Sequence, residues 1–248
     1  MSEEKEASSN TIKPIFFDSA GKIVFSKTPQ CMLFVGEPSS GKSFAVKNIL
    51  YRYLKDSYYK FGIVVSPTAN FSGDFDFLPP TSIWPKYDEA RVLKYVSKLA
   101  DYRKQHNNEL PPPSFLLFDD CLGQINFYSP EFSNFLACFR HYNISIYFVS
   151  QYLSGFGSST LLREITTGAF IFPTQFENSL KVLYKAFGGI LGDYDEFKAL
   201  IQRIGEQEHH CVLYIANQKS KETTYYDFIA SKVPEFHVNF ATSNPKKQ

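Results

Sequence analysis

The sequence lacks the features that mark secreted, membrane-spanning or strongly basic proteins. Its four cysteines, Cys31, Cys121, Cys138 and Cys211, lie far apart without the spacing of a zinc site, and three of them sit in apolar runs. This pattern predicts buried free thiols in a reducing compartment. No apolar run is long enough to span a membrane, and the first residues do not resemble a signal peptide. We therefore expect a soluble, intracellular protein.

The charge balance is equally restrictive. A formal net charge of +1 excludes a basic surface over the whole molecule, so any contact with nucleic acid must come from a local patch or from subunit assembly. The apolar content of 44% supports a substantial core. We expect a single domain over residues 14–240, a disordered polar tail at 1–13 and a loose tail at 241–248. The five histidines show no metal spacing, and we expect His209-His210 at a strand edge rather than as a ligand pair.

The organising stretch is a glycine-rich loop between an apolar run, 31–35, and a helical pattern, about 42–55. Its spacing is that of a phosphate-binding P-loop, G-x-x-x-x-G-K-S. Glycines allow backbone conformations that turn the loop's N–H groups toward phosphate oxygens, and the helix N-terminus adds partial positive charge. Lys42 would reach the β- and γ-phosphates, and the Ser43 hydroxyl would ligate Mg²⁺. The expected nucleotide contacts are Gly36, Glu37, Pro38, Ser39, Ser40, Gly41, Lys42, Ser43 and Phe44.

A second acidic pattern follows at Asp119-Asp120, directly after the apolar run 114–118. After a P-loop, such a run is typical of a Walker B strand. Asp119 would hold Mg²⁺ through water, and Asp120 would polarise the attacking water. Considered alone, the pattern also fits a buried strand that ends in an acidic turn.

Gln151 ends the next buried strand, which covers residues 143–151. In open parallel sheets the ligand lies outside the carboxyl ends of the strands, so Ser43, Asp119 and Gln151 should converge on one edge. Gln151 would sense the γ-phosphate or orient the water. The alternative is a polar strand cap without a catalytic role.

The remaining elements follow from periodicity and from turn residues. Hydrophobic spacing predicts strands at 61–65 and 168–172, and helices at about 88–106, 130–141, 161–165, 176–187 and 193–204. Residues 15–17 with 23–25, and 210–216 with 223–227, indicate two hairpins. Residues 66–87 are predicted to form a long loop, a length that is often functional.

These motifs occur in the order of the FtsK–HerA superfamily of P-loop ATPases. The sequence most resembles the viral branch, the poxvirus-type DNA-packaging ATPases of large DNA viruses, virophages and related elements. The resembling blocks lie between residues 30 and 175. They are Val35-Gly36-Glu37-Pro38-Ser39-Ser40-Gly41-Lys42-Ser43, Val64-Val65-Ser66-Pro67-Thr68, Leu117-Phe118-Asp119-Asp120, and Arg140-His141-Tyr142-Asn143-Ile144-Ser145 through Ser150-Gln151.

The resemblance implies an α/β fold of the RecA-like P-loop type. A mostly parallel central sheet is flanked by helices, with an additional strand between the P-loop and Walker B strands, and the chain adds a C-terminal β-hairpin. It also implies an ATP- and Mg²⁺-dependent motor that moves double-stranded DNA into a capsid as a homo-oligomeric ring, with a capsid vertex protein as a further partner. The implied location is the host-cell cytoplasm or viral factory, or the virion. An arginine finger maps onto Arg140, with Arg163 as the second candidate.

Two other functions remain open from the residues. A small-molecule kinase would need an acceptor pocket and a lid, for which residues 66–87 are available. A nucleotide-gated assembly protein would bind ATP with only incidental turnover. The polar strand ends at Asp119-Asp120 and Gln151 favour hydrolysis, because a kinase does not need a positioned water.

Overall fold

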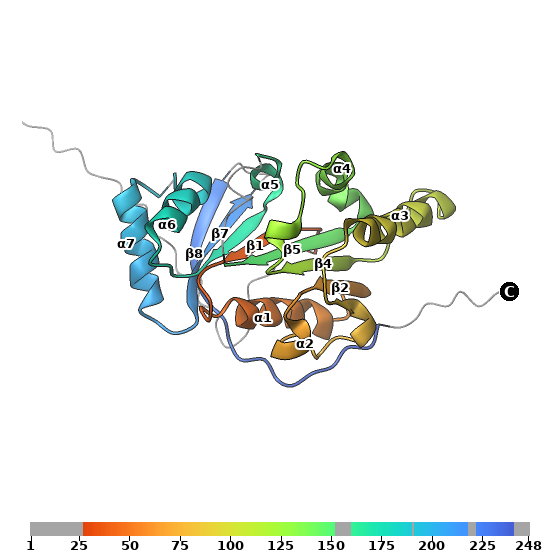
Figure 1. Cartoon of the computed structure of the whole chain (residues 1–248), viewed down its shortest axis with the longest axis horizontal. Coiled ribbons are helices and arrows are strands. Elements are labelled where there is room, and N and C mark those ends of the chain that lie inside the picture. The colour runs from red at the N-terminus through yellow and green to blue at the C-terminus, as the bar shows by residue number, and fades with distance from the viewer. Residues whose placement is uncertain (1–26, 152–159, 190, 218–221, 241–248) are drawn as a thin grey trace, which may run out of the picture.

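The computed structural model describes residues 27–151, 160–189, 191–217 and 222–240. Its centre is an eight-stranded sheet in the order β3-β2-β4-β5-β1-β6-β7-β8 (Figure 1). The strands are β1 (Cys31–Val35), β2 (Phe61–Val65), β3 (Ile83–Trp84), β4 (Ser114–Asp119), β5 (Ile144–Ser150), β6 (Gly168–Ile171), β7 (His210–Asn217) and β8 (Glu222–Ile229). The strands from β3 to β6 run parallel, whereas β7 and β8 are antiparallel to their neighbours.

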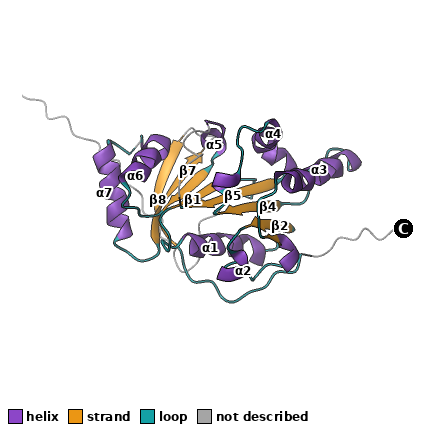
Figure 2. Cartoon of the chain, in the orientation of Figure 1, coloured by secondary structure: helices purple, strands orange, loops and turns teal. Residues whose placement is uncertain are grey.

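Helices cover both faces of this sheet (Figure 2). The α-helices are α1 (Lys42–Lys55), α2 (Ala69–Ser72), α3 (Glu89–Gln105), α4 (Pro130–Cys138), α5 (Thr160–Ile165), α6 (Glu177–Leu183) and α7 (Tyr194–Gly205). Short turns form η1 (Pro80–Ser82), η2 (Leu122–Gln124) and η3 (Phe139–Tyr142), which are 3₁₀, and η4 (Tyr184–Gly188), which is π-helical. Among the described residues no helix is both long enough and apolar enough to cross a bilayer.

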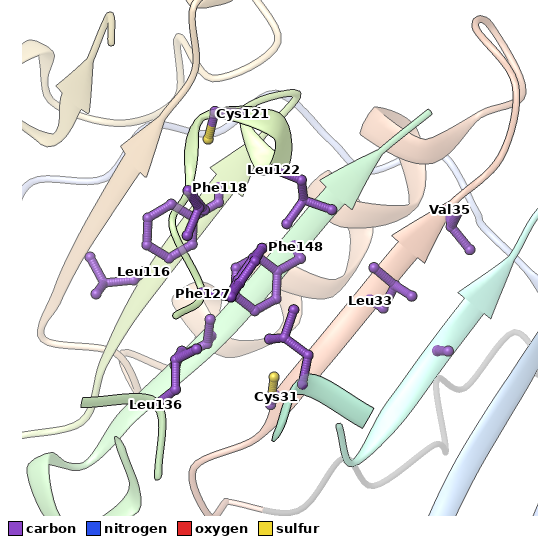
Figure 3. Close-up of a cluster of buried hydrophobic side chains, with 14 of the residues drawn as sticks. Cys31, Leu33, Val35, Leu116, Phe118, Cys121, Leu122, Phe127, Leu136 and Phe148 are labelled. Carbon is purple, nitrogen blue, oxygen red and sulfur yellow. The ribbon is translucent and has the colours of Figure 1, made fainter. Parts of the chain in front are cut away.

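The core consists of two layers because successive side chains of a strand point to opposite faces. In β1, Cys31, Leu33 and Val35 join the cluster beneath α3 to α7, whereas Met32 and Phe34 join the cluster beneath α1. Figure 3 shows the first cluster, in which side chains of β1, β4 and β5 lie over one face of the sheet. The central strands are therefore buried on both sides, which explains their nearly continuous apolar sequences.

The chain after β8 closes the second layer. It runs in extended form past α1 and α2 (Figure 1). The Asn48 side-chain amide of α1 donates to the Ser231 carbonyl at 2.7 Å, and the Phe236 ring packs against Tyr51 and Phe77. This segment ties the helix that follows the P-loop to the connection between β2 and β3.

The structure confirms the predicted α/β class and the C-terminal hairpin, which continues the main sheet through β6. It corrects the loop predicted at 66–87, which contains α2, η1 and the edge strand β3. The helix predicted at 130–141 is α-helical only to Cys138, and the one predicted at 176–187 ends in a π-turn. The hairpin predicted at 15–17 and 23–25 and both tails lie outside the described residues.

A glycine in β2 provides a test of how rigid the layer beneath α1 is. A Cβ at Gly62 would lie 2.0 Å from the ring of Phe115, which is fully buried, whereas a Cβ at Gly123 would meet nothing within 4 Å. We expect Gly62→Ala to lower the free energy of unfolding by about 1–3 kcal/mol or more through overpacking. Gly123→Ala, the control, should change it by less than about 0.5 kcal/mol. Urea denaturation measures the free energy of unfolding of both variants. Equal values would show that the Phe115 side chain moves aside at no cost in stability.

Candidate nucleotide-binding site

The predicted P-loop joins β1 to α1 at the carboxyl edge of the sheet. A Cβ at Gly36 would lie 2.4 Å from the Cβ of Phe172, so the loop can pass the end of β6 only with glycine there. Gly41 is the N-cap of α1 with a φ of 98°, a left-handed conformation that favours glycine. Sequence and packing therefore require glycine at both ends of the loop.

The Lys42 side chain packs against the P-loop instead of facing solvent. Only 7% of Lys42 is exposed, because its ammonium group donates to the carbonyls of Gly36 at 2.9 Å and Glu37 at 2.6 Å. Burial lowers the pKa of the ammonium, and the nearby carboxylates of Asp120, Asp119 and Glu37 oppose that shift. The cation is thus held against the loop that it is expected to serve.

Asp119 ends β4 as a buried carboxyl group. The Ser66 hydroxyl, at the end of β2, donates to its Oδ2 at 2.7 Å. Burial raises the pKa of Asp119 to about 6, the neighbouring Asp120 adds to the shift, and the bond from Ser66 opposes it. A carboxyl group poised in this way ionises fully when a cation comes close.

Asp120 and Gln151 form a direct pair beside this carboxyl group. The Gln151 side-chain amide donates to Asp120 Oδ2 at 2.9 Å, and the Asp120 side chain is exposed. Asp120 adopts a φ of 49°, which turns the chain sharply away from β4. The carboxylate and the amide are therefore positioned together at the surface, as an acceptor and a donor for one polar ligand.

Strand register brings these parts together. Val35 at the end of β1 lies opposite Ser150 at the end of β5, and Asp119 at the end of β4 lies opposite Val149. The P-loop, the acidic pair and Gln151 therefore share one edge, as predicted. Arg140 in η3 and Arg163 in α5 precede β5 and β6, so both lie toward the amino edge.

Several polar partners of the site were not identified from the sequence. Ser66 lies within a block that carries the resemblance, yet its contact with Asp119 depends on a strand pairing that no local pattern reveals. The Glu37 carboxylate accepts from the backbone N–H of Gln175, so this side chain is bound to the connection after β6. His209 lies beside Gly41 and Phe44 instead of serving only as a strand edge.

Three features define the class of this protein. A P-loop follows β1, an acidic pair follows β4, and β5 lies between those two strands. The protein is a P-loop ATPase with one strand inserted between the P-loop and Walker B strands, as the sequence predicted. The chain belongs to the family described as Poxvirus A32 protein, whose model matches residues 22–163, more than half of its length. The viral resemblance inferred from the sequence is thereby confirmed.

Two curated viral proteins are similar in sequence. Uncharacterized protein 075L of Invertebrate iridescent virus 6 is 28% identical over 207 residues, which cover 82% of this chain and 77% of that protein. Uncharacterized protein L437 of Acanthamoeba polyphaga mimivirus is 25% identical over 197 residues, which cover 76% and 67% of the two chains.

Solved structures share the fold at lower identity. The genome packaging NTPase B204 from Sulfolobus turreted icosahedral virus 2, in complex with ATP-gammaS, superposes with a TM-score of 0.58 at 15% identity. The match covers 82% of this chain and 98% of that one. The pCW3 conjugation coupling protein TcpA with ATPgS gives 0.57 at 12% identity, over 82% and 61% of the two chains.

The raised pKa of Asp119 predicts how stability depends on pH. The folded protein holds a proton up to about pH 6, whereas the unfolded chain releases it near the ordinary value of 3.8. The protonated Asp119 therefore adds its full contribution to the free energy of unfolding below about pH 4. This contribution is lost as the pH rises to about 6. Asp119→Asn should exceed the wild type in stability by up to about 3 kcal/mol above pH 6 and match it below pH 4.

Urea unfolding of the metal-free proteins across pH 3.5–7.5 measures this difference. Asp56→Asn, at the exposed end of α1, is the control and should follow the wild-type curve. A constant difference between Asp119→Asn and the wild type at every pH would contradict the shift.

Proposed function

We propose that this chain is the ATP-driven motor that packages viral double-stranded DNA into a capsid. The observation that carries the proposal is the shared edge of P-loop, Asp119 and the Asp120–Gln151 pair, in a chain of the Poxvirus A32 protein family. Fold relatives described as genome packaging NTPases support the same function. ATP is the nucleotide that we assign to the loop.

The residues at the edge fit hydrolysis. Lys42 would exchange its two loop carbonyls for phosphate oxygens, since charge-assisted bonds to phosphate are the stronger ones. The paired Asp120 and Gln151 would hold a water between an acceptor and a donor, in line for attack on the γ-phosphate. This pair favours hydrolysis over transfer to a second substrate, because it provides for water at the place where a kinase needs an acceptor.

The same residues fit a magnesium ion. Mg²⁺ is usually bound by one or two carboxylates together with substrate phosphates and waters. Asp119 provides a buried carboxyl group and Ser43 provides a hydroxyl in the first turn of α1. Within the described residues there is no cluster of three or more histidine, cysteine or acidic side chains that could bind a metal unaided. The ion, when bound, would neutralise charge between the β- and γ-phosphates.

Oligomerisation would complete the site. Arg140 precedes β5, whereas the P-loop lies at the carboxyl end of that strand. Because β5 spans about 20 Å at the usual rise per residue, Arg140 cannot reach the P-loop of its own chain. In a head-to-tail ring, the amino edge of one subunit faces the carboxyl edge of the next, and Arg140 or Arg163 would approach the neighbour's γ-phosphate. Charge supports this arrangement: the exposed Lys60 and Arg140 lie at the amino edge, and Asp120 lies at the carboxyl edge.

The proposed partners are double-stranded DNA in the ring and a capsid vertex protein. The proposed location is the host-cell cytoplasm or viral factory, with association with the virion. Because the net charge is +1, one subunit should bind DNA weakly, and a ring would gain affinity by placing several weak sites on one duplex.

DNA-stimulated hydrolysis tests the function. We expect the assembled wild type to release phosphate from ATP faster when double-stranded DNA is added, with stimulation that falls steeply as salt rises. Lys42→Ala should lose at least two orders of magnitude in rate, since it removes a cation that stabilises the transferring phosphoryl group. Lys47→Ala, one turn further along α1 and over the Phe77 ring, is the control and should retain activity. ATP turnover indifferent to DNA would point to a phosphotransferase or an assembly protein.

Mixed assemblies test the position of the arginine. Arg140→Ala and Lys42→Ala should each be inactive alone, because an arginine finger contributes roughly 10³–10⁵ in rate. Mixing them should restore part of the activity, since some interfaces then pair an intact Arg140 with an intact Lys42. Phosphate release is followed while the ratio is varied. Background activity at every ratio, with mixed rings confirmed by mass, would exclude Arg140 and transfer the role to Arg163.

A further inference from the structure

Two aromatic rings stack beside the P-loop: Phe44, predicted above only as a nucleotide contact, and His209, which has no role in the proposed hydrolysis. Phe44, directly after Ser43, lies with its ring centroid 4.7 Å from that of His209, and the ring planes meet at 26°. The Nδ1 atom of His209 lies 3.9 Å from the point where a Cβ of Gly41 would be. The imidazole is partly open to solvent, since 44% of the His209 side chain is exposed, and its Nε2 atom lies 3.7 Å from the exposed Glu208 carboxylate.

His209 reaches this position from the turn between α7 and β7. Because β7 runs antiparallel to β6, its first residue lies at the carboxyl edge, next to the end of β6. His209 has a φ of 65°, a left-handed conformation in which asparagine, aspartate and histidine are the enriched residues other than glycine. The following residue, His210, is fixed through its Nδ1 at 2.9 Å from Asp227 of β8, so the turn is anchored.

The two flanks of the P-loop differ in chemistry. β5 and β4 lie on one side of β1 and supply Gln151, Asp119 and Asp120, whereas β6 and β7 lie on the other side. The γ-phosphate must face the side that positions water. The nucleoside of the same ligand therefore extends toward β6 and β7, where Phe44 and His209 are stacked.

An open groove of about 460 Å³ lies on that second flank. It runs between the connection after β6 and the end of α7, and its polar walls include Glu37, Gln175, Gln202 and Glu206. Glu37 is already bound to the Gln175 backbone, whereas the exposed Glu206 carboxylate, three residues before His209, can only accept hydrogen bonds.

We propose that His209, supported from behind by Phe44, is the stacking platform for the base of the bound nucleotide, and that Glu206 contacts the base edge. Placed at the six position of the base, this acceptor would favour the exocyclic amine of adenine and disfavour the carbonyl oxygen of guanine. The inference rests on the proposed function, because it takes the phosphates to lie in the loop Gly36–Ser43. It adds the residues that select the base.

Binding measurements that separate base from phosphates test this proposal. Isothermal titration in MgCl₂ gives the affinities of ATP, GTP and inorganic tripolyphosphate for the full chain. We expect His209→Ala to weaken ATP binding about tenfold, within the range found for loss of one base-stacking ring, and to leave tripolyphosphate binding unchanged. His209→Phe should retain ATP binding, since it keeps a ring. Glu206→Gln should narrow the preference for ATP over GTP.

His106→Ala is the matched control. His106 also stacks on an aromatic ring, because its ring centroid lies 3.9 Å from that of Tyr102. It lies beyond the end of α3, at the opposite edge of the sheet. This variant should bind all three ligands as the wild type does. Unchanged ATP binding by His209→Ala, or equal losses of ATP and tripolyphosphate binding, would overturn the base platform alone. Failure of the wild type to bind either ATP or tripolyphosphate would overturn the phosphate site, and the proposed function with it.

Discussion

The parallel register of β1, β4 and β5 is the constraint on which the site depends. Their parallel pairing aligns the carboxyl ends, although β1 starts two residues later than β4 against β5, so Val35, Asp119 and Ser150 finish within one residue of each other across the sheet. Each strand is buried on both faces, and a slip of one residue would turn every side chain to the opposite layer. The core clusters above and below the sheet therefore fix the positions of Asp119 and Gln151 more firmly than any contact within the site.

The electrostatics of this edge favour the binding of a nucleotide that carries a metal ion. A buried ammonium group and a buried carboxyl group lie close together, and burial disfavours the charged form of each: it lowers the pKa of Lys42 and raises that of Asp119. A magnesium nucleotide would supply phosphate charge to Lys42 and a cation to Asp119. Binding would thus relieve two desolvation penalties that the folded protein carries by itself.

Local patterns predicted much of this arrangement. Residue spacing over short stretches was enough to predict several features. These are the P-loop, the bounds of α1 and β2, the acidic pair after β4 and the polar residue after β5. Long-range packing decided the rest. The edge strand β3 has two residues, too few for a periodic signal, and forms because the chain after β2 returns to its open edge. The burial of Lys42 depends on the loop's own carbonyls, and the place of His209 depends on the antiparallel pairing of β7 with β6.

The two flanks of β1 allow catalysis and base recognition to be separate. The residues that we propose to position water follow β4 and β5. The stacked rings come from α1 and the turn before β7, and the groove lies between the connection after β6 and α7. A neighbouring subunit that brings Arg140 must approach the γ-phosphate, which faces the first flank. In the arrangement proposed above, the base would lie on the flank away from that contact, against His209 and beside Glu206 of one chain. On this proposal, nucleotide exchange would not require the subunit interface to open, because the groove beside Glu206 is formed within a single subunit.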